Sequence, residues 1–185
     1  MMTEEWVDIV DANNNVIDAV PRSVMRQQRL LHRATYIVIE NALGQLYVQR
    51  RTATKDYCPS MLDACCGGVV SKGEEIQASA YRELAEEMGI TNVPLKFHGS
   101  FLHQDNECNV WGSVFSCQFD GELVLQQEEV EYVLLMTTDE IKIRASEFTA
   151  DSLAAIQVWL TVADNQNQIS CNNILSCRHI QGNDI

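Results

Sequence analysis

Apolar and polar residues follow two different periods along the chain, and together they predict a mixture of strands and helices. The segment Asn13–Asn15 tolerates left-handed backbone and should turn the first two strands into a hairpin. Strands are predicted over 6–10, 16–20, 35–40, 46–50, 65–70, 96–103, 110–120 and 131–136. Helices are predicted over 24–31, 138–145 and 149–163, the first of them capped by Ser23.

The clearest helical pattern covers residues 75–88. Ile76, Ala80, Leu84 and Met88 recur every four residues, which places them on one face of a helix. Gly89 follows directly and suits the left-handed position that ends a helix. Because strands and helices do not alternate regularly, the expected architecture is an α/β fold with a mixed β-sheet flanked by helices.

The order of these elements suggests three parts. Residues 1–30 form a hairpin and helix extension, residues 31–163 the main domain, and residues 164–185 a polar tail rich in Asn and Gln. The extension needs a surface to pack against, and a second subunit would provide one, so a homodimer is expected.

Charge and composition narrow the range of partners. The chain of 185 residues has a net charge of −13, which argues against sequence-independent nucleic-acid binding. It has no apolar run long enough to span a membrane, and its acidic start lacks an apolar signal core, so a cytoplasmic location is expected. Six of the nine arginines lie between Arg22 and Arg51, which leaves room for a local site for a compact anion.

The seven cysteines show no CxxC pair, and free thiols are the expected state in a reducing compartment. Cys171, Cys177 and His179 lie together in the polar tail, where a structural metal site is not favoured.

Three glutamates carry the candidate chemistry. Glu83, Glu86 and Glu87 are spaced i, i+3, i+4, so their carboxylates share one helical face. Their repulsion near the negative end of the helix dipole should require a positive partner. A hard divalent cation is one such partner, and a solvated acidic face partly paired with Arg82 is the alternative.

The surrounding residues favour the cation. Gly68, Glu74, Arg82-Glu83-Leu84, Glu86-Glu87 and Gly89-Ile90 match every defined position of the Nudix box, over 23 residues. The chain therefore resembles the Nudix hydrolases, which implies an α/β/α sandwich and a Mg²⁺- or Mn²⁺-dependent hydrolase that cleaves a small-molecule diphosphate, of nucleoside-diphosphate type or another organic diphosphate.

The resemblance also implies roles for single residues. Glu83, Glu86 and Glu87 with the Gly68 carbonyl would be metal ligands, with Glu83 and Glu86 catalytic. Arg82, Glu74 and Gly89 would support the site. A later glutamate often joins the ligands or acts as base; Glu128, Glu129 and Glu131 are candidates, and Glu129 fits best.

Other segments resemble the bacterial YfcD-type group within the family: His32-Arg33-Ala34-Thr35-Tyr36, Val48-Gln49-Arg50-Arg51-Thr52 and Leu62-Asp63-Ala64. They are also similar to type 1 isopentenyl-diphosphate isomerase, which implies that Arg50, Arg51 or Lys55 contacts the diphosphate. Cys66 matches that enzyme's catalytic thiol and His32 one of its metal ligands. However, Gly68 replaces a metal-binding histidine, and Cys108 and Val110 replace two glutamates.

Isomerisation requires an acid and a base on opposite faces of the substrate, so these replacements favour hydrolysis. Cys66 is then best interpreted as a small buried residue. An isomerase-like enzyme and a non-catalytic diphosphate sensor remain the alternatives.

Overall fold

The computed structural model describes residues 4–162. Within them, strand β3 (His32–Glu40) contributes to both apolar layers of the core. Tyr36 and Val38 pack in one layer, and Ile37 and Ile39 pack in the other, because successive side chains of a strand point to opposite faces.

The sheet is mixed, as predicted. Strand β7 (Asn109–Gln118) runs parallel to β3, and β6 (Lys96–Gln104) pairs antiparallel with β7. On the other side, β4 (Leu46–Arg51) pairs with β8 (Val130–Met136) and with β5 (Leu62–Asp63). Strands β3 and β4 pair at Glu40 and Leu46, and the two halves of the sheet diverge from that point. This divergence opens the sheet where the candidate site lies.

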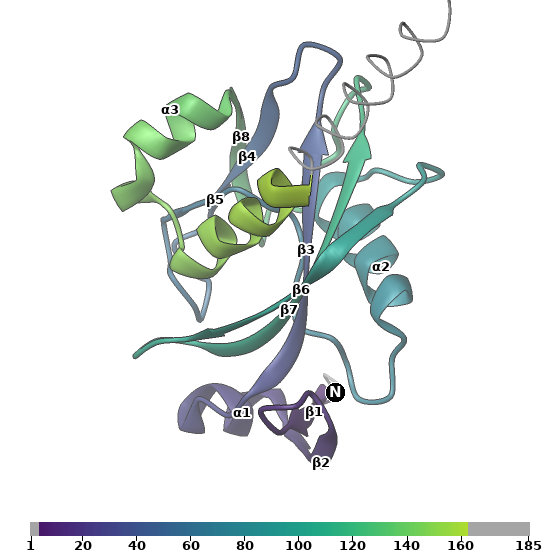
Figure 1. The fold of residues 1–185 in the computed structure, drawn as a ribbon, viewed down its shortest axis with the longest axis vertical. Coiled ribbons are helices and arrows are strands. Elements are labelled where there is room, and N and C mark those ends of the chain that lie inside the picture. Colours follow the sequence, from purple (N-terminus) through teal and green to yellow (C-terminus); the bar gives the residue numbers. More distant parts are fainter. Residues whose placement is uncertain (1–3, 163–185) are drawn as a thin grey trace, which may run out of the picture.

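Helices cover both faces of the sheet, which confirms the predicted α/β/α sandwich (Figure 1). Helix α2 (Ile76–Met88) packs on the layer that contains Ile37 and Ile39. Helix α3 (Thr138–Ile143), a 3₁₀ turn (Ala145–Glu147) and a helix over 150–162 lie on the opposite side. Gly89 ends α2 with a φ of 68°, as its position predicted.

The extension contains the predicted hairpin, β1 (Trp6–Val10) and β2 (Val16–Pro21), and Asn14 takes a φ of 64° in its turn. The boundaries predicted for the following helix are wrong. Helix α1 (Arg22–Gln28) begins directly after Pro21 and has no side-chain cap from Ser23. It ends at Gln28 because Arg29 takes the left-handed conformation with a φ of 50°.

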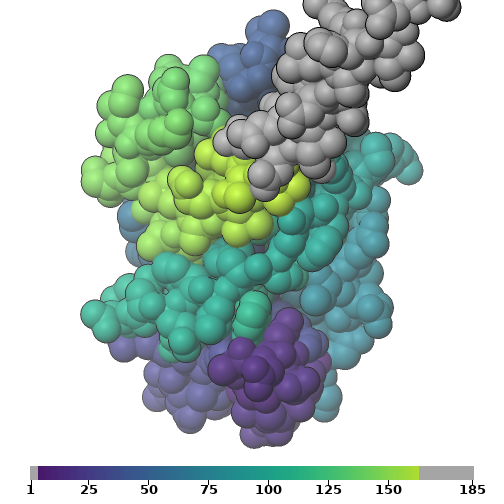
Figure 2. Space-filling model, in the orientation of Figure 1, coloured from purple at the N-terminus to yellow at the C-terminus, as the bar shows by residue number. Residues whose placement is uncertain are grey.

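The extension packs on its own chain. Ile9 of β1 pairs with His32 of β3, and Val7, Ile9 and Met25 bury a small core with Val69. Figure 2 shows the purple N-terminal surface directly against the teal surface of the segment that contains β6 and β7. The need for a second subunit as a packing surface is therefore removed, and the homodimer stays a prediction.

Two other strand predictions need correction. Residues 65–70 form isolated bridges, such as Ile37 with Cys66, because their backbone crosses the opening between β3 and β4. Strand β3 begins at His32, earlier than predicted, because its parallel pairing with β7 extends to Val110.

No helix within residues 4–162 combines the length and apolar character that crossing a membrane requires. The polar tail over 164–185, with Cys171, Cys177 and His179, lies outside the described residues.

Candidate functional site

The three glutamates of α2 open onto one cavity of about 150 Å³. Glu87 is 3% exposed, whereas Glu86 points to solvent and the Glu83 side chain is 13% exposed. Gly68 forms one wall and Glu129, in the loop before β8, another. The remaining lining residues are Glu5, Arg22, Lys55, Gly67, Val69, Arg82 and Gln126. Glu128 and Glu131, the other two candidates for a late glutamate, do not line this cavity.

Arg82 holds much of the acidic cluster together. Its guanidinium donates to Glu74 at 2.8 and 3.0 Å, to Glu83 at 2.8 Å and to Glu86 at 3.1 Å. The hydrogen bonds from Arg82 to Glu74 hold the pKa of Glu74 below its usual range. Glu74 also accepts from the backbone N–H of Ser71 at 3.1 Å, which ties the loop before α2 to the helix. Arg82 and Glu74 thus join the helix and the loop by direct hydrogen bonds.

Glu87 is held from the opposite side. Its carboxylate accepts from the Gly67 backbone N–H at 3.2 Å and from the Gln49 amide at 3.3 Å. The Lys55 ammonium lies 3.8 Å from Glu87 and forms a closer ion pair with Glu129. The single ammonium group of Lys55 therefore contacts both Glu87 of α2 and Glu129 of the loop before β8.

Glu83 lies against the backbone of Gly68. A Cβ atom added at Gly68 would stand 2.6 Å from Glu83 Oε1, so the glycine leaves just enough room for this carboxylate. Burial and the negative charge of Glu87 together raise the pKa of Glu83 to about 7, although Arg82 opposes the rise. The ionised form of Glu83 is consequently destabilised unless positive charge is added nearby.

The donor set fits a hard divalent cation. Carboxylate oxygens and a backbone carbonyl are the ligands that Mg²⁺ and Mn²⁺ prefer. The Gly68 carbonyl accepts one hydrogen bond, from Thr35 N at 2.9 Å, and retains a second lone pair. In the arrangement of residues 4–162, no three acidic, His or Cys side chains converge on one point, and Arg82 and Lys55 pair with the carboxylates instead.

The residues expected to contact the diphosphate are separated by the structure. Lys55 lines the acidic cavity. Arg51 is buried, pairs with Asp63 at 3.2 Å and donates to the Tyr57 carbonyl, and it lines a second cavity beside the first. Arg50 lies 3.9 Å from Glu131 and lines neither cavity.

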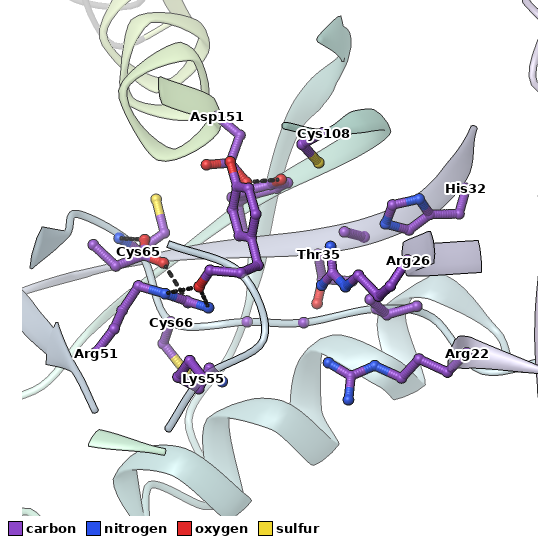
Figure 3. A pocket seen from close by; sticks show the side chains of 17 residues that line it. Arg22, Arg26, His32, Thr35, Arg51, Lys55, Cys65, Cys66, Cys108 and Asp151 are labelled. Atoms are coloured by element: carbon purple, nitrogen blue, oxygen red, sulfur yellow. Dashed lines mark hydrogen bonds and ion pairs between the residues drawn. The ribbon is translucent and has the colours of Figure 1, made fainter. Parts of the chain in front are cut away.

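The second cavity brings in residues that the sequence interpretation missed. Arg22 and Arg26 extend into it from α1 (Figure 3). The cluster of arginines between Arg22 and Arg51 was the available signal, but the distance in sequence from α1 to the glutamates hid the connection.

Cys66 and His32 also line this second cavity. The Cys66 thiol is buried and donates to the Glu83 carbonyl at 3.6 Å, and burial raises its pKa. It thus has the surroundings of a small core residue.

Asp63 lines the same cavity, and burial raises the pKa of its carboxyl to about 7, although Arg51 opposes this.

The His32 imidazole is expected to stay neutral down to about pH 4. It is 2% exposed, and burial lowers its pKa to about 4. Since the unfolded chain takes up this proton near pH 6.5, His32 should lower the stability of the fold as pH falls from 6.5 to 4. An NMR titration of the ring protons measures the pKa directly, and a midpoint near 6.5 would contradict this expectation.

Comparison with known proteins agrees with this geometry. Residues 30–156 match the model of the NUDIX domain. Over 161 residues, 87% of this chain and 88% of the relative, the sequence is 50% identical to the uncharacterized Nudix hydrolase YfcD of Salmonella typhi. It is 35% identical to an uncharacterized Nudix hydrolase of Pseudomonas aeruginosa, over 84% of this chain and 94% of that protein.

Among solved structures, the crystal structure of DR0079 from Deinococcus radiodurans superposes with a TM-score of 0.71. It is 24% identical, and the match covers 83% of this chain and 97% of that chain. At this identity the likeness bears on the fold alone.

Proposed function

This chain belongs to the Nudix hydrolase family and is a hydrolase acting on pyrophosphate bonds; on that premise, we propose that it cleaves a small organic diphosphate with the help of Mg²⁺ or Mn²⁺ bound at Glu83, Glu86 and Glu87. The cavity in which these glutamates face Gly68 and Glu129 is the observation that carries the proposal. A divalent ion bound there would neutralise diphosphate oxygens and activate an attacking water.

The chain's own residues prepare the site for this task. Arg82 positions Glu83 and Glu86 by direct hydrogen bonds, and Gly67 and Gln49 fix the orientation of Glu87. Such preorganisation supports catalysis because the carboxylates need not reorient when charge develops in the transition state. Glu129, which lines the same cavity, is the side chain proposed to take a proton from water.

Hydrolysis is favoured over isomerisation of an isoprenoid diphosphate. An isomerase needs an acid and a base on opposite faces of the carbon chain. Here Cys66 is buried with a raised pKa, and Val110 carries no ionisable group. A non-catalytic sensor is disfavoured because binding alone does not require so many clustered carboxylates.

Purified full-length protein incubated with a panel of nucleoside and other organic diphosphates should release phosphate or a monophosphate in the presence of Mg²⁺ or Mn²⁺. A chelator should abolish the release, and fresh metal should restore it. Isopentenyl diphosphate belongs in the same panel. An isomerised product without phosphate release, or turnover unaffected by the chelator, would overturn the proposal.

A further inference from the structure

A second cavity adjoins the acidic one and has the opposite charge. The two share the wall formed by Gly67, Gly68 and Val69, and they also share Arg22 and Lys55. The second cavity, called the basic cavity below, is lined by four cationic side chains, Arg22, Arg26, Arg51 and Lys55, and by two carboxylates, Asp63 and Asp151. A diphosphate that contacts the glutamates through a metal can therefore reach a basic cavity with its other end.

Both carboxylates of the basic cavity already have partners. Asp63 pairs with Arg51 at 3.2 Å, and Asp151 accepts a hydrogen bond from the Tyr36 hydroxyl at 2.8 Å. Among the described residues, neither carboxylate forms an ion pair with Arg22 or Arg26.

Both arginines form ion pairs with carboxylates that do not line the basic cavity. Asp56 lies 3.8 Å from Arg22 and 3.5 Å from Arg26, and Glu5 lies 3.7 Å from Arg22. The Nε atoms of both arginines are buried and have no hydrogen-bond partner among the described residues. Figure 3 shows both side chains entering from one side of the cavity, with Lys55 on the other.

Thr35 adds a second kind of unsatisfied group. Its side chain lines the same cavity, is 1% exposed, and its hydroxyl has no partner within residues 4–162. A buried polar atom without a partner costs free energy, so such atoms normally meet a ligand or water. Two guanidinium groups and a hydroxyl around one space form a set of donors suited to phosphate oxygens.

The size of the basic cavity limits what it accepts. Its volume is about 60 Å³, and one water needs roughly 10–15 Å³ of such space. This is space for a few waters, which suits a phosphate group, whereas a nucleoside is much larger. We therefore expect the bulky part of a substrate to lie on the outer side, near the glutamates.

We propose that Arg22, Arg26 and Lys55 bind the terminal phosphate of the substrate, so that the enzyme accepts diphosphates with one free end and discriminates against those substituted at both ends. This inference rests on the proposed function. Water would attack one phosphorus, the bridging P–O bond would break, and the products would be an organic monophosphate, inorganic phosphate and a proton. Arg22 and Arg26 lie outside the family match over 30–156, so this selectivity would come from the extension.

The first test measures binding without turnover. Inorganic phosphate is titrated calorimetrically into the full chain in the presence of a chelator. Arg26→Gln is expected to weaken phosphate binding about 10-fold or more, since a hydrogen bond to a charged group contributes at least that factor. Arg26→Lys, which keeps the charge but loses the planar fork, should give an intermediate loss. Arg29→Gln is the matched control, because Arg29 is exposed just after α1 and outside the cavity.

The second test compares ADP with ADP-ribose, which share a base and differ in whether the diphosphate has a free end. Wild-type kcat/KM should favour ADP by about 10-fold or more, and Arg26→Gln should remove the preference mainly through KM. Circular dichroism melting of each variant verifies folding.

Two results would overturn this inference and leave the proposed metal-dependent hydrolysis intact: unchanged phosphate binding in folded Arg26→Gln, or efficient cleavage of ADP-ribose by the wild type. Phosphate binding that depends on Arg26, with no hydrolysis of any panel compound, would instead reject the proposed function.

Discussion

Glu83→Gln is expected to lower kcat on the order of 100- to 1000-fold and, at the same time, to make the metal-free protein more stable. The loss of activity follows from removing a charged ligand from a preorganised site. The gain in stability follows from the burial of Glu83 beside Glu87, which raises its pKa from 4.5 to about 7.

The sign of the pH dependence follows from that rise. Below about pH 4.5 the group is protonated in both folded and unfolded chains, and its ionisation costs no stability. As pH increases to about 7, the unfolded chain loses the proton first, so the wild-type fold loses roughly 3 kcal/mol relative to the variant. Glu83→Gln should therefore match wild type near pH 4 and exceed it by that amount above pH 7.

Urea denaturation in chelator across this pH range measures the difference. Glu75→Gln is the matched control, because it removes the same charge at the start of the same helix from an exposed side chain outside the cavity. Added Mg²⁺ should stabilise wild type and the control but have much less effect on Glu83→Gln. Equal stability of the variant and wild type at pH 8 would show that Glu83 is not destabilised in the metal-free fold.

Gly68→Ala is expected to cost about 100-fold in kcat/KM with a change in stability below about 1 kcal/mol. The new Cβ would meet the Glu83 carboxylate at 2.6 Å, and the end of that side chain can move at little cost to folding. Displacing a ligand by about 1 Å is enough to cause a loss of this size in rate. Steady-state kinetics with saturating metal, together with urea denaturation, tests both parts.

Substitution of the neighbouring Gly67 should instead act mainly on stability. At Gly67, where φ is 146°, a Cβ would stand 2.0 Å from the Thr35 carbonyl oxygen, which is backbone and cannot yield. Gly67→Ala should therefore lose about 3 kcal/mol of stability. Gly73→Ala, at a φ of 70° with no atom within 4 Å, should lose about 1 kcal/mol. Wild-type activity in Gly68→Ala would show that the close fit of Glu83 against this backbone is not needed.

The candidate glutamate site could be located from the sequence because its parts are close along the chain. Glu83, Glu86 and Glu87 belong to one helix, and helical periodicity alone places them on a common face. Glu74 and Gly68 lie in the loop that leads into that helix, so their spacing carried the same information. Local order of this kind survives in a sequence pattern, and the helix and its terminating Gly89 were correctly predicted for that reason.

The substrate side was less visible because it depends on contacts between distant segments. Arg50 and Arg51 are neighbours on β4, and the pleat of a strand turns adjacent side chains to opposite faces. The sequence did not show which of them faces a cavity, and only Arg51 does, held there by Asp63.

What the sequence by itself determined is the acidic helix, its loop and the family to which they belong, since all three depend on spacing within one short segment. What only the tertiary structure decided is the charge opposite that helix. Pairing of β1 with β3 carries α1 to the opening between β3 and β4, and this brings Arg22 and Arg26 beside Gly67 and Lys55. The packing of the extension on the sheet sets that proximity, and no periodicity along the chain encodes it.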